Sequence, residues 1–256
     1  MISAGSVVKS KPGAKMELEG RVALVTGGAH RVGRAILLAL ARAGADVVLH
    51  YQRAEAEALA TQAEAQALGR RVLLVRADLS RVEEIEAMFE EVRRSFPALQ
   101  VLVNSAAIME AQPVEQVTSA DWDRTLDLNL RAPFFCAQHA ARLMPEGGVI
   151  INIADVAGLQ PWARYPVHSV SKAGVVMLTQ VLARALAPRI RVNAVAPGPV
   201  AKPPGLAAEK WEAVTRRMPL KREGAPEDIA QAVLYLVQAE FVTGAILTVD
   251  GGAHLV

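Results

Sequence analysis

Short apolar runs alternate along the chain with longer, Ala-rich segments of helical periodicity. The runs are too short for helices and are apolar on both faces, which predicts buried strands of a parallel sheet. Alternation of this kind predicts an α/β fold with a doubly wound sheet and helices on both faces. The predicted strands are 22–26, 46–50, 72–76, 101–103, 149–153, 191–195 and 246–249, and the predicted helices are 31–43, 54–67, 81–95, 119–143, 166–187 and 226–238.

Two segments fall outside this pattern. Residues 1–18 have neither a helical nor a strand period and predict a flexible N-terminal tail, which leaves 19–256 as a single domain. The stretch 197–225 is rich in Pro and Gly and is long for a simple connection. It predicts either a mobile flap over a substrate or a plain excursion at the surface.

Composition narrows the class of protein. Apolar residues make up 52% of the 256 residues, enough for a large core. No apolar run reaches the ~18 residues that a membrane span needs. The 28 basic and 26 acidic residues leave a net charge of +2, which gives no reason to expect nucleic acid as a partner. The single cysteine, Cys136, excludes an internal disulfide and fits a reducing cytoplasm, and no residues have the spacing of zinc ligands.

A glycine-rich turn connects the first predicted strand to the first predicted helix. It runs from Gly27 to Gly33, where the backbone can turn sharply and the helix N-terminus offers free N–H groups to a phosphate. The second strand ends without the carboxylate that holds the ribose hydroxyls of NAD(H), whereas Arg31 and Arg53 offer guanidinium groups to a 2′-phosphate. These residues predict NADP(H) as the cofactor, the alternative being arginines on a solvated face.

From residue 20 to 256 the chain resembles the short-chain dehydrogenase/reductase family. The resemblance implies a Rossmann-like sheet of seven strands, a nicotinamide cofactor, a small-molecule substrate and a homotetramer. It rests on the glycine turn together with Asp78-Leu79, Asn104-Ser105-Ala106-Ala107, Asn129, Ser171-Lys172-Ala173-Gly174, Pro197-Gly198, residues 226–230 and Val249-Asp250-Gly251-Gly252.

The same resemblance assigns the cofactor contacts. Asp78 would contact the adenine, Asn104 would support the cofactor from the turn after the fourth strand, and Pro197-Gly198 would lie beside the nicotinamide. The full expected set is Gly27, Arg31, Val32, Gly33, His50, Tyr51, Arg53, Asp78, Leu79, Asn104, Ala106, Lys172, Pro197 and Gly198.

Within the family the chain most resembles the pteridine reductases. Arg31 stands where the usual turn has its middle glycine, and His50-Tyr51-Gln52-Arg53 resembles their NADPH-binding stretch. Asp155 stands where most members have a catalytic serine. The resemblance therefore implies reduction of a pteridine or dihydrofolate.

The family's catalytic tyrosine is missing. In the family this tyrosine acts as the acid and lies four residues before a lysine. Here the lysine is Lys172, and the position four residues earlier holds His168. Tyr165 would lie about 10 Å from Lys172 along a helix, which is too far for Tyr165 to take the place of the missing tyrosine. We hypothesise that Asp155 and His168 share and deliver the proton. By family analogy Lys172 would hold the nicotinamide ribose and Asn129 would support a water relay. The alternative is a dinucleotide-binding protein without turnover.

The substrate is less well defined. Pteridine reductases stack the pterin on an aromatic ring just after the fourth strand, where this chain has Ala107-Ile108-Met109-Glu110, so only the sulfur of Met109 could cover a flat ring. Another carbonyl reductase, such as a 3-oxoacyl carrier-protein reductase, is the alternative. It would need a basic docking patch, for which Arg124, Arg131 and Arg142 are candidates.

Overall fold

The computed structural model describes residues 15–202, 205 and 207–256. A single seven-stranded sheet, parallel throughout, runs through the molecule in the order β3-β2-β1-β4-β5-β6-β7. This confirms the predicted doubly wound, Rossmann-like sheet. The strands are β1 (Val22–Val25), β2 (Asp46–Tyr51), β3 (Val72–Arg76), β4 (Val101–Asn104), β5 (Gly148–Ile153), β6 (Ile190–Pro197) and β7 (Ile246–Val249).

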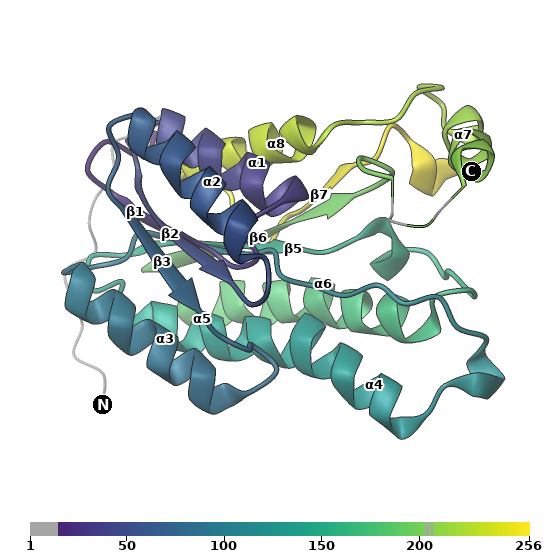
Figure 1. The fold of residues 1–256 in the computed structure, drawn as a ribbon, viewed down its shortest axis with the longest axis horizontal. Helices are drawn as coiled ribbons and strands as arrows, with labels where there is room; N and C mark the ends of the chain where they lie inside the picture. Colours follow the sequence, from purple (N-terminus) through teal and green to yellow (C-terminus); the bar gives the residue numbers. More distant parts are fainter. Residues whose placement is uncertain (1–14, 203–204, 206) are drawn as a thin grey trace.

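Helices cover both faces of the sheet (Figure 1). Among the described residues, no helix combines the length and the apolarity that crossing a membrane requires. On one face lie α1 (Arg31–Arg42), α2 (Glu55–Ala67) and α8 (Pro226–Gln238), and on the other lie α3 (Val82–Ser95), α4 (Ser119–Leu126), α5 (Ala132–Arg142) and α6 (Pro166–Leu186).

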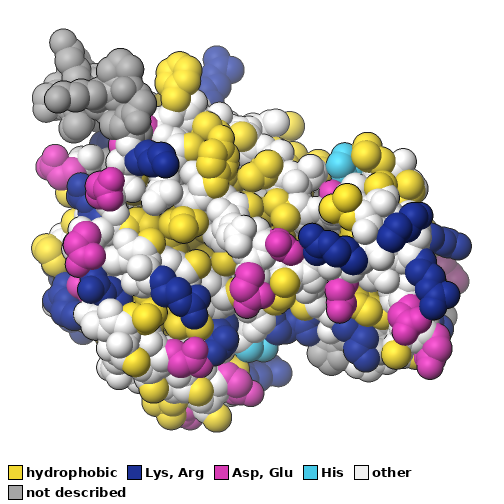
Figure 2. All heavy atoms as spheres, turned by 90° about the horizontal axis from the view of Figure 1, so that it is seen from above, with side chains coloured by type: hydrophobic (Ala, Val, Ile, Leu, Met, Phe, Trp, Pro, Cys, Tyr) yellow, Lys and Arg dark blue, Asp and Glu magenta, His cyan; other side chains and the backbone are white. Residues whose placement is uncertain are grey.

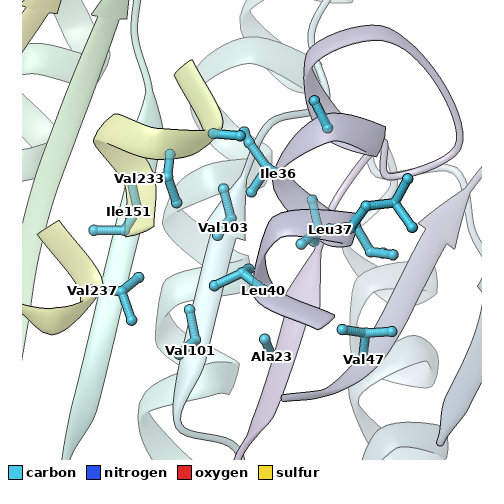
Figure 3. Packing of buried hydrophobic residues seen from close by; sticks show 14 of the residues in the cluster. Ala23, Ile36, Leu37, Leu40, Val47, Val101, Val103, Ile151, Val233 and Val237 are labelled. Carbon is cyan, nitrogen blue, oxygen red and sulfur yellow. The ribbon is translucent and has the colours of Figure 1, made fainter. Parts of the chain in front are cut away.

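The core has a layer on each side of the sheet because alternate residues of a strand point to opposite faces. Val101 and Val103 of β4 pack toward α1 and α8, whereas Leu102 between them packs with the helices of the opposite face. Figure 3 shows Leu40 of α1 and Val237 of α8 meeting this strand surface. Side chains buried on both faces explain why the strands read as continuous apolar runs.

The strand order reverses between β1 and β4. From β1 the chain winds outward to β2 and β3, and from β4 it winds the other way to β7. In doubly wound sheets ligands bind in the crevice at the carboxyl ends of the strands where the order reverses. The turn after β1 and the turn after β4 therefore meet where a ligand is expected.

Two predicted segments differ from the structure. The helix predicted over 119–143 is interrupted between α4 and α5 by a π-helical turn, η2 (Asp127–Arg131). The stretch predicted as loose over 197–225 contains a further helix, α7 (Ala208–Arg217), at one end of the molecule (Figure 1). None of the residues of α7 is buried, so the apolar pattern that marks core helices is weak there.

The predicted N-terminal tail falls mostly on residues 1–14, which lie outside the described residues. From Lys15 on, the chain packs against the domain. The backbone N–H of Met16 donates to the carbonyl of Gln238 at 3.3 Å, and Leu18 is 1% exposed. The domain therefore includes residues 15–18, which the prediction had placed in the tail.

Candidate active site

The glycine turn brings three backbone segments into close contact. Gly27 has φ +65°, a conformation that favours glycine, and a Cβ there would lie 3.1 Å from the Cα of Ala106 in the turn after β4. A Cβ on Gly33 would overlap the carbonyl of Gly27. Helix α1 begins at Arg31 without a side-chain cap, so its first N–H groups remain available to a ligand.

A groove of about 380 Å³ opens beside this turn. Its size, its helix N-terminus and its arginine side chains fit the adenosine and phosphates of a nicotinamide dinucleotide. Of the predicted cofactor residues, Gly27, Arg31, Val32, Gly33, His50, Tyr51, Arg53, Leu79 and Ala106 line it. The other predicted residues, Asp78, Asn104, Lys172, Pro197 and Gly198, lie outside its lining.

His50 supports the glycine turn through the hydrogen bonds of its ring. It is 3% exposed, its Nδ1 accepts the N–H of Gly27 at 3.1 Å, and its Nε2 lies 3.0 Å from the carbonyl oxygen of Ala77, to which it donates. Burial lowers the pKa of His50 to about 4, so the ring is neutral. Both ring nitrogens have protein partners, so His50 shapes the turn from the lining of the groove, and its contact with the cofactor stays a prediction.

The two arginines predicted to bind a 2′-phosphate have different neighbours in the structure. The guanidinium of Arg31 donates to the carbonyls of Ala201 and Lys202, at 2.9 and 3.3 Å, in the segment after β6. Arg53 is exposed at the groove near Asp78. Burial raises the pKa of Asp78, but hydrogen bonds from Ser80 and the charges of nearby arginines, Arg53 among them, outweigh it and leave this pKa below its usual value.

Asn104 belongs to a buried chain of hydrogen bonds. Its amide donates to the Oδ1 of Asn152 in β5 at 2.9 Å, and the amide of Asn152 donates to Thr179 of α6 at 2.9 Å. This chain fixes β4, β5 and α6 relative to one another. Gly198 also has a packing role, because a Cβ there would lie 2.5 Å from the Cβ of Asp250.

Sequence reasoning missed Thr26 as a site residue. Its Oγ1 accepts the backbone N–H groups of Ser105 and Ala106, at 2.9 and 3.1 Å. Thr26 therefore joins the end of β1 to the turn after β4. The signal was its place directly before the glycine turn.

The predicted catalytic residues come together at the carboxyl end of β5. Asp155 follows β5, and its Oδ1 accepts the N–H of Ala157 at 2.7 Å. Its Oδ2 lies 3.6 Å from the Nε2 of His168, whose side chain is 4% exposed against 20% for Asp155. Lys172 lies one turn after His168 on α6, as the spacing predicted.

The hydrogen bonds of His168 define the role of each ring nitrogen. Nδ1 lies 3.1 Å from the carbonyl oxygen of Ile108, which can only accept, so Nδ1 carries a proton. In the neutral ring Nε2 is then an acceptor that faces the Asp155 carboxylate. It is buried without a hydrogen-bond partner among the described residues. A buried acceptor left unpaired is costly, so this nitrogen is available for a ligand or a proton.

Asn129 holds this ring from the π-helical turn η2. Its side chain forms two hydrogen bonds with the backbone of Ile108. The Oδ1 accepts the N–H and the amide donates to the carbonyl, both at 2.9 Å. The same amide donates to the Oγ of Ser171 at 3.1 Å, and Ser171 donates to the carbonyl of His168. Ser171 is therefore a second supporting residue that was not among the predicted ones.

Lys172 is buried beside the pair. Its Nζ donates to the carbonyl of Ile153 at 2.7 Å. Burial lowers the pKa of Lys172 to about 8, against the opposing effect of the Asp155 charge. The ammonium is thus held at a fixed point near the carboxylate and can act on the field that the catalytic pair experiences.

The structure places the residues that the sequence suggested for substrate binding in different surroundings. Met109 is 37% exposed and lies just after the turn that follows β4. Arg124 is paired with Glu110 and Asp121, and Arg131 is paired with Asp127 at 3.0 Å. These two arginines are therefore neutralised within the chain, which weakens the case for a basic docking patch.

The comparisons with known proteins agree with this geometry. The family model described as enoyl-(acyl carrier protein) reductase matches residues 27–254. The chain is 37% identical to 3beta-hydroxysteroid dehydrogenase 1 of Eggerthella lenta, with 93% of this chain and 95% of that protein covered. It is 36% identical to a 3-oxoacyl-[acyl-carrier-protein] reductase of Synechocystis, with 92% and 97% covered.

A solved structure shows the same fold. The short chain dehydrogenase of Burkholderia cenocepacia in complex with NADP has a TM-score of 0.88 and 36% identity, covering 93% of this chain and 99% of that one. The described site lies on this shared fold. The chain therefore belongs to the short-chain dehydrogenase/reductase family and is an oxidoreductase.

Proposed function

We propose that the protein is an NADPH-dependent reductase that transfers hydride to a C=O or C=N group, with Asp155 and His168 as its proton donor. The observation that carries the proposal is the buried Nε2 of His168, which has no protein partner and lies 3.6 Å from the Asp155 carboxylate. A structural histidine would satisfy both nitrogens, as His50 does. A free nitrogen that faces a carboxylate beside a buried lysine is typical of an acid–base site.

The cofactor is NADP(H). Support comes from the groove beside the glycine turn, from Arg53 in its lining, and from residues 50–53 at the end of β2, which include no carboxylate to repel a 2′-phosphate. The Burkholderia relative was solved with NADP. When bound, the cofactor supplies the hydride.

The pair must hold one proton for reduction. A carbonyl oxygen or imine nitrogen can only accept, and so can the neutral Nε2 of His168 and the carboxylate of Asp155. One proton shared between the two supplies the missing donor. It moves to the substrate as the hydride arrives, and the pair returns to its deprotonated state. In the reverse direction the same pair accepts the proton of a hydroxyl group.

The supporting residues keep this geometry. Asn129 fixes Ile108, and the carbonyl of Ile108 fixes the ring of His168, so Nε2 stays directed at Asp155. Lys172 places its positive charge beside the carboxylate and would hold the nicotinamide ribose. Asn129 would also support a water relay that reloads the pair from solvent.

Two substrate classes follow. The first is a pteridine or dihydrofolate, supported by Asp155 in place of the serine and by Arg31 in the glycine turn. The second is a short 3-oxoacyl thioester, favoured by the likeness to the Synechocystis reductase. The internal pairing of Arg124 and Arg131 favours the first over a carrier-protein substrate.

The test is a substrate panel. The protein is incubated with NADPH and, in turn, with dihydrobiopterin, dihydrofolate and an acetoacetyl thioester, while nicotinamide absorbance is followed. Loss of absorbance with one substrate identifies the class. NADPH binding without turnover on all three would instead support a dinucleotide-binding protein without catalysis. Light scattering of the same sample tests the proposed homotetramer.

A further inference from the structure

Arg31 joins two parts of the molecule that lie far apart in the sequence. It belongs to the glycine turn at the start of α1, and its guanidinium donates to the carbonyls of Ala201 and Lys202. These carbonyls belong to the segment that leaves β6 after Pro197. The two contacts form a bridge between the cofactor turn and the end of the sheet where the family places the nicotinamide.

The backbone at Arg31 adopts a conformation that most residues avoid. Its φ is +52°, in the left-handed region, where a glycine would fit without a steric penalty. An arginine at this position therefore carries a backbone cost, and its side-chain contacts offset that cost. Residues in such conformations persist where the surrounding structure holds them, often beside functional sites.

The direction of the guanidinium bears on cofactor selection. Arg31 lines the groove as Arg53 does, but its Nη1 and Nη2 donate to the two carbonyls of the segment after β6. Arg53 is exposed on the wall of that groove, in the stretch directly after β2 where the adenosine ribose is expected. The two arginines thus line one groove but have different neighbours, the segment after β6 for Arg31 and Asp78 for Arg53.

We propose that Arg31 is a positioning residue that holds the segment at Ala201 and Lys202 against the cofactor turn, while recognition of the 2′-phosphate stays with Arg53 as in the proposed function. The first part rests on the proposed function, because the segment after β6 then borders the substrate and the nicotinamide. Arg31 thereby orders the substrate side of the site and leaves recognition of the 2′-phosphate unchanged.

The test compares three variants of the full-length protein. Arg31→Gly removes the guanidinium and suits the positive φ, so it is expected to fold. Arg31→Lys retains a charge but not the forked donor. Arg53→Ala is the matched control at the second arginine that lines the groove. For each we would measure dissociation constants of NADPH and NADH by nicotinamide fluorescence, amide hydrogen exchange over residues 196–202, and KM and kcat on the best substrate.

The expected results separate the two arginines. Arg31→Gly speeds exchange over 196–202 and raises KM for the substrate by about threefold to tenfold, as expected for lost hydrogen bonds. It changes the NADPH/NADH affinity ratio by less than about twofold, and Arg31→Lys restores KM only in part. Arg53→Ala lowers that affinity ratio by about tenfold or more without changing exchange over 196–202.

The opposite pattern would overturn the proposal. If Arg31→Gly reduces the affinity ratio as much as Arg53→Ala, Arg31 is a phosphate ligand. If exchange over 196–202 is unchanged in Arg31→Gly, the bridge does not position the segment. Failure of the proposed function is a separate outcome, because a protein without turnover on any substrate still reports cofactor affinity and exchange.

Discussion

A double-mutant cycle at Asp155 and His168 tests the proposed proton donor most directly. His168→Asn removes Nε2, while the asparagine amide can still donate to the carbonyl of Ile108. Asp155→Asn removes the carboxylate with little change in shape. If the two residues hold one proton together, either substitution disables the donor, and the double variant loses little more than each single variant.

The magnitude follows from the geometry. At the 3.6 Å between Nε2 and Oδ2, a protonated ring and a carboxylate attract one another by about 4–5 kcal/mol at an effective dielectric constant of ~20, before desolvation is subtracted. Each factor of ten in rate corresponds to about 1.4 kcal/mol. We therefore expect each single variant to lose about 10²- to 10⁴-fold in kcat/KM, the usual contribution of a general acid, and the coupling to be about 3–5 kcal/mol, close to the loss in each single variant.

The assay measures initial rates of NADPH oxidation for the wild type, both single variants and the double variant. Tyr165→Phe is the matched control, because Tyr165 directly precedes the same helix but lies about 10 Å along the axis from Lys172, and we expect it to retain wild-type activity. Circular dichroism and NADPH affinity establish that each variant is folded. Losses that simply add in the double variant, or a fully active His168→Asn, would refute the shared proton.

Three further predictions concern the scaffold of the site. Gly33→Ala places a methyl group against the carbonyl of Gly27 and should weaken NADPH binding by about tenfold or more. Gly69→Ala costs some stability because φ is +79° there, but its Cβ meets nothing within 4 Å, so the folded variant should keep wild-type NADPH affinity in the same fluorescence titration. Thr26→Val leaves two backbone amides without their acceptor and should lower the free energy of unfolding in urea by about 1–3 kcal/mol, which Thr26→Ser should largely recover. Lys172 has a pKa of about 8 instead of 10.5, so its buried charge costs stability below pH 8, and stability rises as the pH climbs between these values. Lys172→Met should therefore abolish activity yet raise the thermal midpoint at pH 7 with less gain near pH 10; a lower midpoint at pH 7 would contradict this.

The sheet and most of its helices could be predicted because the core imposes a pattern on the sequence. Val101, Leu102 and Val103 read as a buried strand because each faces a layer of helices. Helix α7 was not predicted because none of its residues is buried and Pro and Gly flank it. Local pattern is informative only where a face is buried.

The central residues of the candidate site could be predicted, but the supporting residues Thr26 and Ser171 and most of the contacts could not. Motif spacing was enough to bring Asp155, His168 and Lys172 together. It could not show that His50 uses both ring nitrogens within the protein, or that Arg31 turns toward Ala201. Such contacts depend on the distance between segments that are far apart in the chain, which neither periodicity nor motif spacing encodes.

The π-helical turn at Asp127–Arg131 sets the angular phase of a long helical segment. One extra residue in a turn rotates everything after it by about 100° relative to a regular helix. Asn129 lies within this turn, where it reaches both Ile108 and Ser171. Deleting one residue between 126 and 128 would restore regular helical phase and turn this amide away from Ile108. The irregular turn therefore orients a single side chain, that of Asn129. A regular helix in its place would remove the contact of Asn129 with Ile108 and with it the support of the His168 ring.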